Sequence, residues 1–261
     1  RALQAGCALA RGSFIARMDA DDIAQPERLA RQYTYMQEHP DVALCGTHVS
    51  MFGGRIGVGR ARYEAWINGL RSHGDIAREL FIECPVAHPT FFLRRAPFER
   101  AGGYEEHGWA EDYDSCMRLF LAGARFGVVP DPLLRWRESP GRLSMTAERY
   151  SPARFRALKR FYLARSYLRG RKRFHQWGAG EVGKVWLREW EDLRPEAVVD
   201  INPRKIGRKI HGVRVIAPDE LPEPGLTFTL IAVGAPGARD EIRAWLKPRG
   251  YIELQDFLFV A

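Results

Sequence analysis

The sequence predicts an α/β protein with two domains. This prediction rests on three observations. Short apolar runs alternate with amphipathic helical patterns along the chain. A glycine-rich turn at 178–183 lies between an expected strand and an expected helix. The 261 residues are 46% hydrophobic, which is enough for two cores. We expect a first domain over 1–148, a basic helical connector over 149–173 and a smaller parallel-sheet domain over 174–261.

The first domain is expected to interleave strands and helices. Residues 2–10 are typical of the second half of a helix, with Gly12 as its C-cap. A helix over 26–38 should carry Leu29, Tyr33 and Met36 on its apolar face. Further helices are expected over 75–82 and 111–121. Short apolar runs predict strands over 14–18, 42–46, 88–93 and 126–129, and the run at 49–52 is a candidate extension of the strand 42–46 past a bend.

The connector over 149–173 is rich in arginine and lysine. Leu158, Phe161, Tyr162 and Leu168 give it an apolar stripe. Two interpretations stay open. It is either a solvated helix packed on the first domain or a basic amphipathic helix that lies on an anionic membrane surface.

The last region alternates strands with helices, which predicts a small parallel sheet of Rossmann-like type. Helices should follow the glycine turns at 178–183 and 234–237. The expected strands cover 174–177, 197–200, 227–233 and 251–254.

Composition bounds the partners and the compartment. The net charge of +8 favours polyanionic partners such as nucleotide diphosphates or anionic lipid, unless the basic surface has no partner. We expect no nucleic-acid partner. The four cysteines are far apart, which argues against a zinc site or a disulfide framework. With no apolar run long enough to span a bilayer and no visible signal peptide, we expect a cytoplasmic protein, with peripheral contact to the inner membrane face as a further option.

The most informative stretch is an acidic turn after the expected strand 14–18. Asp19, Asp21 and Asp22 crowd a strand end, where carboxylates repel one another and lose hydration. A hard divalent cation, Mg²⁺ or Mn²⁺, offsets both costs and shares its oxygen ligands with substrate phosphates. The turn therefore predicts a metal–diphosphate site. The alternative is that these residues only cap the next helix.

A second acidic group opens the helix expected over 111–121. Glu111, Asp112 and Asp114 follow an aromatic residue, Trp109, and are more than a helix cap needs. A carboxylate at the mouth of a site can act as general base on a hydroxyl nucleophile.

Five motifs then occur in a fixed order: Asp-Ala-Asp-Asp, His-Pro-Thr, Gly-Gly-Tyr, Trp-x-Glu-Asp-Tyr-Asp and Arg-x-Arg-Glu-Ser. In this order, residues 1–146 resemble the family 2 glycosyltransferases of GT-A fold. The resemblance implies an inverting transfer of a sugar from a nucleotide-diphosphate-sugar to an acceptor hydroxyl in polysaccharide or glycoconjugate synthesis. It implies Mg²⁺ or Mn²⁺ as cofactor and a glycan or lipid-linked acceptor.

The resemblance also assigns roles. Asp19 and Asp21 match the D-x-D pair, in which Asp19 would approach the nucleotide ribose and Asp21 would ligate the metal. Asp112 matches the acceptor base. Glu111 matches its neighbour, which contacts the acceptor or orients the site.

Three further residues match the family's donor site. His88 corresponds to the His-Pro pair of the donor pocket, unless it only binds backbone at a strand end. Arg137 and Arg142 lie on the loop that closes over the diphosphate, where arginine suits bidentate contact. The alternative is a pair of solvated loop arginines. Many members carry a metal-binding His in this loop, and residues 131–147 contain none.

The start of the chain departs from the family pattern. There is no initiator Met, and the sequence begins inside an expected helix. We therefore expect a truncated GT-A domain that lacks the N-terminal part of the family fold, which supplies the nucleotide-base pocket.

Gly178, Gly180 and Gly183 have the spacing of a nucleotide-binding fingerprint, and Asp200 ends the next expected strand. The region resembles the nucleotide-sugar-binding domain of sugar O-acyltransferases and also NAD-binding folds. A structural glycine turn without a ligand is the alternative. Two other functions stay open. One is an NAD(P)-dependent oxidoreductase or epimerase module, although 174–261 shows no residue set for hydride transfer. The other is a non-catalytic nucleotide-sugar-binding protein.

Overall fold

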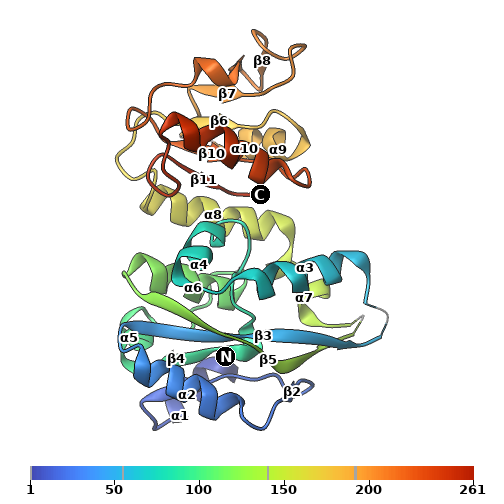
Figure 1. The fold of residues 1–261 in the computed structure, drawn as a ribbon, viewed down its shortest axis with the longest axis vertical. Coiled ribbons are helices and arrows are strands. Elements are labelled where there is room, and N and C mark those ends of the chain that lie inside the picture. Colours follow the sequence, from blue (N-terminus) through green and yellow to red (C-terminus); the bar gives the residue numbers. More distant parts are fainter. Residues whose placement is uncertain (1, 55, 140, 191–192) are drawn as a thin grey trace. The chain divides into compact units, whose positions relative to one another are not determined.

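The computed structural model describes residues 2–54, 56–139, 141–190 and 193–261. The chain divides into two compact units (Figure 1). Unit 1 comprises residues 1–80 and 84–158, and unit 2 comprises 81–83 and 159–261. The protein is thus mixed α/β, and both units contain parallel strands. The domain bounds expected from the sequence stay a prediction.

Unit 1 is built on a five-stranded sheet in the order β1-β4-β3-β5-β2. Its two long central strands, β3 and β5, run parallel, and the outer pairings are antiparallel. The strands are β1 (Phe14–Ala16), β2 (Ile23–Ala24), β3 (Val42–Gly53), β4 (Phe92–Arg94) and β5 (Arg125–Glu138).

Helices cover both faces of this sheet (Figure 1). α2 packs on β3 and β5 from one face, whereas α3 and α4 pack from the other. The helices of unit 1 are α1 (Ala2–Leu9), α2 (Arg28–Glu38), α3 (Val58–Gly69), α4 (His73–Glu79), α5 (Arg95–Arg100), α6 (Glu111–Leu121) and α7 (Leu143–Thr146). Two 3₁₀ turns, η1 (His88–Thr90) and η2 (Glu148–Tyr150), complete it. α8 (Pro152–Arg165) continues into unit 2.

The run at 49–52 extends the strand 42–46, so both belong to β3, whose pairing with β5 shifts register between Thr47 and Val49. The expected strand over 88–93 is wrong in its first half, because His88–Thr90 form a 3₁₀ turn and β4 starts only at Phe92. The turn matters because it brings His88 beside the acidic turn.

Unit 2 is a six-stranded sheet in the order β11-β10-β6-β7-β9-β8, parallel except at the β8–β9 edge. Its strands are β6 (His175–Trp177), β7 (Ala197–Val199), β8 (Lys209–Ile210), β9 (Val213–Ile216), β10 (Thr229–Ile231) and β11 (Phe257–Phe259). The remaining elements are α9 (Glu181–Glu189), η3 (Pro218–Glu220), α10 (Ala238–Leu246) and η4 (Lys247–Arg249). The expected strand at 251–254 is wrong, because the last strand lies at 257–259.

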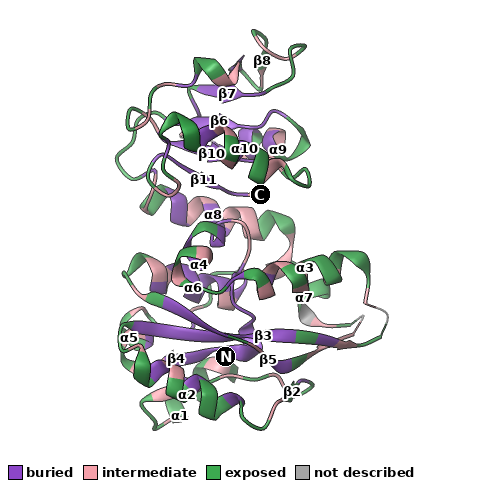
Figure 2. Cartoon of the chain, viewed as in Figure 1, coloured by how far each residue is buried: buried purple, intermediate pink, exposed green. Residues whose placement is uncertain are grey.

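The core of unit 2 has two layers, one on each face of the sheet. Leu187 of α9 packs with Val198 and Val215 on one face. Leu246 of α10 packs with Trp177 on the other. Burial follows the strands (Figure 2), and among the described residues no helix is both long and apolar enough to cross a bilayer.

Candidate active site

The acidic turn of unit 1 is tightly built. The Asp22 backbone N–H donates to the Asp19 carbonyl, and the Asp19 carboxylate pairs with Arg17 at 2.6 Å. Asp22 Oδ1 accepts the Arg137 backbone N–H at 2.8 Å, while its Oδ2 is buried and accepts no hydrogen bond from the described residues. Burial, reinforced by the charges of Asp19 and Asp21, raises the pKa of Asp22 to about 6. Asp21 is the exposed member of the three.

A buried arginine on α2 links η1 to the residue that precedes the acidic turn. Arg28 on α2 is only 2% exposed and donates to the carbonyls of Pro89 (2.7 Å) and Arg17 (2.9 Å). One turn later, buried Gln32 donates to the carbonyls of Cys45 and Thr90. The polar face of α2 thus holds the acidic turn and η1 in fixed positions.

His88 is buried and binds a side chain rather than backbone. Its Nε2 lies 2.8 Å from the Tyr104 hydroxyl, and Tyr104 is itself buried. Burial, with a smaller contribution from the charge of Arg17, lowers the pKa of His88 well below its ordinary value. The imidazole is therefore neutral at pH 7.

The base predicted from the sequence lies near the same cluster. Asp112 is half-buried in the first turn of α6, and its Oδ1 accepts the Tyr113 backbone N–H at 2.8 Å. Burial raises the pKa of Tyr104, and the charges of both Arg17 and Asp112 act on it. Asp112 at the start of α6 and Arg17, which pairs with Asp19 of the acidic turn, thus both act electrostatically on the Tyr104 hydroxyl.

Glu111 has a partner that the sequence did not indicate. The Tyr150 hydroxyl, on η2, donates to the Glu111 carboxylate at 3.0–3.1 Å. Burial and the charges of Glu111 and Asp112 raise the pKa of Tyr150. No periodic pattern could have marked Tyr150, because it belongs to a short turn in the basic segment.

The third acid of this group, Asp114, makes contacts that stabilise the fold. Asp114 is fully buried and accepts hydrogen bonds from Trp109 Nε1 (2.8 Å) and Arg118 Nε (2.9 Å). Arg118 in turn donates to the Gly103 carbonyl at 2.6 Å. Asp114 therefore ties the glycine-rich turn to α6.

Three arginines gather beside the acidic turn. Arg137 Nε donates to the Asp21 carbonyl at 2.7 Å. Arg142 pairs with Glu138 and interacts electrostatically with Asp22. Arg60 of α3, which the sequence did not single out, also pairs with Glu138, at 2.6 Å. The two predicted arginines are thus close to the predicted metal turn, but the expected loop position of Arg137 is wrong, because Arg137 lies in β5, which continues to Glu138.

The donor set of the turn fits a hard cation that is shared with a substrate. Among the residues that the structure describes, no group of three or more His, Cys, Asp or Glu side chains forms a metal cage. Mg²⁺ typically takes one or two protein carboxylates and completes its shell with water and phosphate oxygens. An exposed Asp21 beside the unpaired Asp22 Oδ2 meets that requirement.

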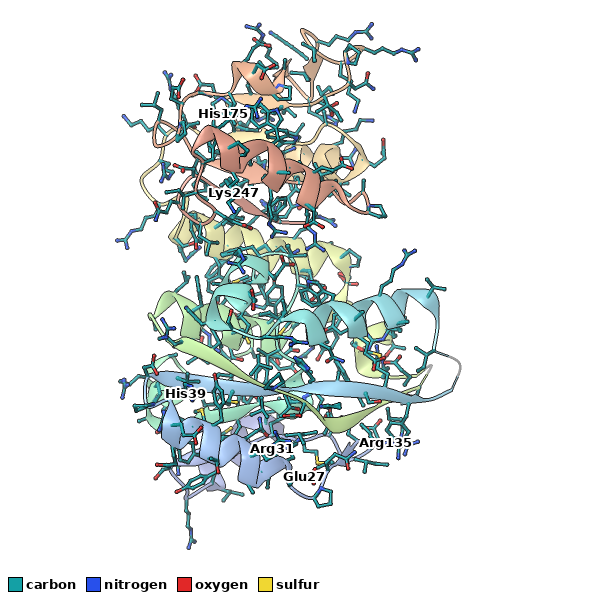
Figure 3. All side chains as sticks on the ribbon, in the orientation of Figure 1. Glu27, Arg31, His39, Arg135, His175 and Lys247 are labelled. Carbon is teal, nitrogen blue, oxygen red and sulfur yellow. The ribbon has the colours of Figure 1, made fainter. Side chains whose placement is uncertain are left out.

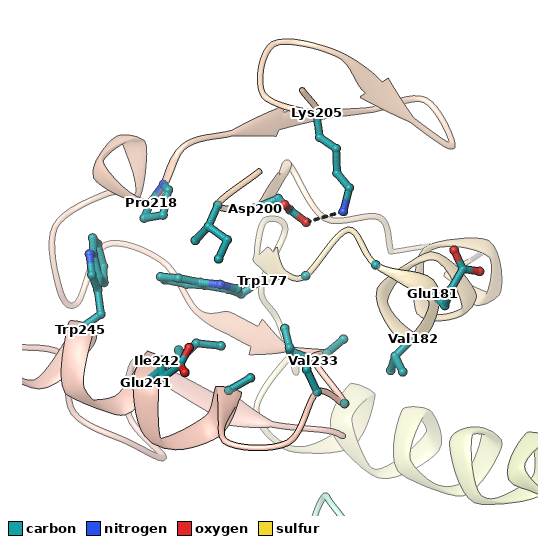
Figure 4. A pocket seen from close by; sticks show the side chains of 17 residues that line it. Trp177, Glu181, Val182, Asp200, Lys205, Pro218, Val233, Glu241, Ile242 and Trp245 are labelled. Carbon is teal, nitrogen blue, oxygen red and sulfur yellow. Dashed lines mark hydrogen bonds and ion pairs between the residues drawn. The ribbon is translucent and has the colours of Figure 1, made fainter. Parts of the chain in front are cut away.

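The glycine turn of unit 2 borders a cavity of about 490 Å³ (Figure 4). Gly178, Gly180 and Asp200 line this cavity, whereas Gly183 is buried beneath the turn. Asp200 is engaged within the chain. Its Oδ2 accepts from the Ala179 N–H at 3.0 Å and from Lys205 Nζ at 3.1 Å, and its Oδ1 accepts from the Asn202 N–H at 2.8 Å.

Comparison with known proteins supports a glycosyltransferase. Residues 1–102 match the family model Glycosyl transferase family 2. The amylovoran biosynthesis glycosyltransferase AmsE of Erwinia amylovora is 33% identical over 52% of this chain and 49% of its own. The O-antigen biosynthesis glycosyltransferase WbnJ of Escherichia coli is 30% identical over 48% and 47%. Residues 1–102, which lie in unit 1, are therefore similar to glycosyltransferase family 2.

Among solved structures, residues 1–349 of S. aureus TarS in complex with UDP-GlcNAc are similar. The identity is 22%, the coverage is 62% of this chain and 45% of that chain, and the TM-score is 0.46. The chain spans about half the length of the curated relatives it matches. The expected likeness of residues 174–261 to sugar O-acyltransferases is not confirmed.

Proposed function

We propose that this chain carries the metal and acceptor half of an inverting glycosyltransferase. Such an enzyme transfers a sugar from a nucleotide-diphosphate-sugar to an acceptor hydroxyl. One observation carries the proposal: Tyr104, the hydrogen-bond partner of His88, feels the charges of both Asp112 and Arg17, and Arg17 is the ion-pair partner of Asp19. The family match over residues 1–102 supports the same reaction class.

On the donor side, each residue has a distinct task. Asp21 ligates the Mg²⁺ or Mn²⁺ ion, and Asp19 lies toward the nucleotide ribose. Arg137 and Arg142 contact the diphosphate, since guanidinium groups match phosphate oxygens. When bound, the metal neutralises the charge of the departing nucleoside diphosphate. His88, neutral and hydrogen-bonded to Tyr104, lines the donor pocket without adding charge.

On the acceptor side, Asp112 is the general base. Its carboxylate takes the proton of the acceptor hydroxyl while the oxygen attacks the anomeric carbon from the face opposite the diphosphate. The bond from that carbon to the diphosphate oxygen breaks, so the configuration inverts. Glu111, held by Tyr150, orients the acceptor. The leaving diphosphate needs no proton, so one base suffices.

The acceptor belongs to the same proposal. A glycan or lipid-linked hydroxyl, in cell-surface polysaccharide or glycoconjugate assembly, is the acceptor class. Contact with an anionic membrane is assigned to the basic segment, which exposes Arg165, Arg169, Arg171, Lys172 and Arg173 in the described structure. Release of the protein from vesicles that contain phosphatidylglycerol on adding salt would support this contact, and equal binding to neutral vesicles would contradict it.

The decisive experiment compares Asp112→Asn with Asp131→Asn in a protein that contains this chain. Asp131 is half-exposed and pairs only with surface Arg31 among the contacts described, so it serves as the matched control. We expect Asp112→Asn to lower sugar transfer by about 10²-fold or more, the contribution of a general base, with donor affinity retained. Wild-type turnover in Asp112→Asn would contradict the proposed role.

A further inference from the structure

The cavity of unit 2 lies where the topology of the sheet predicts a ligand. From β6 the chain moves to β7 on one side, and β10 later pairs with β6 on the other side. The carboxyl ends of β6 and β10 therefore flank the switch point of the sheet, which is the usual binding crevice of open α/β folds. Trp177 and Gly178 at the end of β6 and Ala232 to Ala235 after β10 line the cavity.

One wall of the cavity is aromatic and apolar. Trp177 and Trp245 meet edge to face, with ring centroids 5.2 Å apart and an interplanar angle of 70°. Pro218 and Ile242 lie near this pair of tryptophans (Figure 4) and line the same cavity. Ile201, which is 74% exposed, also lines the cavity. The volume lies within the range typical of small-molecule sites.

The three positions of the turn differ in whether packing requires glycine there. A Cβ on Gly178 would lie 2.5 Å from the Ala232 carbonyl oxygen, and one on Gly183 would lie 1.9 Å from the Gly178 oxygen. Both are therefore required by packing. A Cβ on Gly180 would meet nothing within 4 Å, and its φ of −81° suits any residue. Folding therefore does not require glycine at 180, and the open space beside this backbone leaves room for a ligand.

Asp200 is placed differently from a ribose-binding acid. Its three hydrogen bonds join the glycine turn to the Asn202–Lys205 loop and use most of the lone-pair positions of a carboxylate. Lys205 Nζ also donates to the Ala179 carbonyl at 3.1 Å, which closes the link. The geometry gives Asp200 a positioning role for the turn and leaves it little capacity to accept a ribose diol.

We propose that this cavity binds a nucleotide through its ring and its phosphate, without recognition of the ribose hydroxyls by Asp200. The planar base packs in the corner formed by Trp177 and Trp245. The phosphate lies over Gly180, at the start of α9, where no side chain of the described residues caps the helix. This proposal does not depend on the activity proposed for unit 1.

Calorimetric titration of the full chain with UMP, AMP and NADH in EDTA tests it. An Asp21→Ala background excludes metal-dependent binding by unit 1. We expect one site per chain, at least tenfold weaker in Gly180→Val, which fills the cavity at a position that tolerates a side chain. Leu226→Ala, which is exposed in unit 2 and away from the cavity, should bind normally. Preference for UMP would indicate a uridine nucleotide, and preference for AMP or NADH an adenine nucleotide.

The ribose provides the sharper comparison. We expect dUMP and UMP, or dAMP and AMP, to bind within about threefold of each other. A tenfold or larger loss for the deoxy form would overturn the role given to Asp200. Binding by none of the three nucleotides, or unchanged binding in Gly180→Val, would overturn the site itself.

Discussion

Replacing Arg28 by methionine should destabilise unit 1 far more than the same replacement of Arg31. Both arginines lie on α2, but only Arg28 is buried, at 2% exposure. Arg31 is exposed and pairs with Asp131 across the surface (Figure 3). The pair of variants therefore compares a buried guanidinium with a solvated one in the same helix.

The structure sets the expected difference. Arg28→Met leaves the carbonyls of Pro89 and Arg17 without their donor, and each unsatisfied buried carbonyl costs about 1–3 kcal/mol. Arg28 Nε has no hydrogen-bond partner among the residues that the structure describes, so removing it relieves part of that loss. We expect the free energy of unfolding to fall by about 3 kcal/mol. Arg31→Met should cost about 1 kcal/mol or less, as exposed ion pairs do.

Hydrogen exchange of the β3 and β5 amides measures the free energy of opening for unit 1 alone. A loss in Arg28→Met that exceeds the loss in Arg31→Met by about 2 kcal/mol would agree with the structure. Equal losses in the two variants would refute the view that Arg28 fastens the acidic turn.

Three further predictions concern charges and contacts in unit 1. In EDTA, the unfolding free energy of wild type minus that of Asp22→Asn should fall by up to about 3 kcal/mol as the pH rises from 4 to 7. The reason is that the folded pKa of about 6 lies above the unfolded value, so the folded state binds more protons in this window; a flat difference would contradict it. For His88, the unfolding free energy of wild type minus that of His88→Gln should instead fall as the pH drops below 6.5. The reason is that unfolding lets the buried neutral imidazole bind a proton. Chemical denaturation across pH would show no such trend if His88 were charged in the folded protein. Tyr150→Phe should lower transfer several-fold at unchanged donor affinity, since it releases Glu111; a change in donor affinity alone would count against the acceptor role.

Local sequence patterns located the turns that carry the candidate site residues. They did not predict how these turns pack. The acidic turn, the start of α6 and the glycine turn all lie at element ends, where the sequence places them. Such turns are visible because strand ends and helix starts have their own residue preferences. Within unit 1, the placement of the acidic turn relative to the start of α6 depends on the sheet order, which no local pattern contains.

The buried face of α2 shows where hydrophobic patterning fails. Leu29 and Tyr33, expected to face the core, are 49% and 50% exposed, whereas Arg28 and Gln32 are buried. Only Met36 was placed on the correct face. This helix covers backbone carbonyls of two turns, so its inner face needs hydrogen-bond donors rather than apolar groups.

The strands of unit 2 show a second limit. Val213–Ile216 form a strand that was not predicted, because four residues between turns give little alternation. The predicted strand at 251–254 contains Leu254 in a left-handed conformation, with φ of 71°. The chain therefore turns there, and Phe257–Phe259 pair with β10 instead.

A measurement of Mn²⁺ binding shows directly whether the acidic turn is the metal–diphosphate site. Electron paramagnetic resonance of a protein that contains this chain, in the presence of UDP or GDP, reports whether a Mn²⁺–diphosphate complex is bound. We expect bound Mn²⁺ in wild type, its loss in Asp21→Ala, and its retention in Gly180→Val, which alters only unit 2. Equal Mn²⁺ binding by wild type and Asp21→Ala would contradict the assignment of the metal–diphosphate site to this turn.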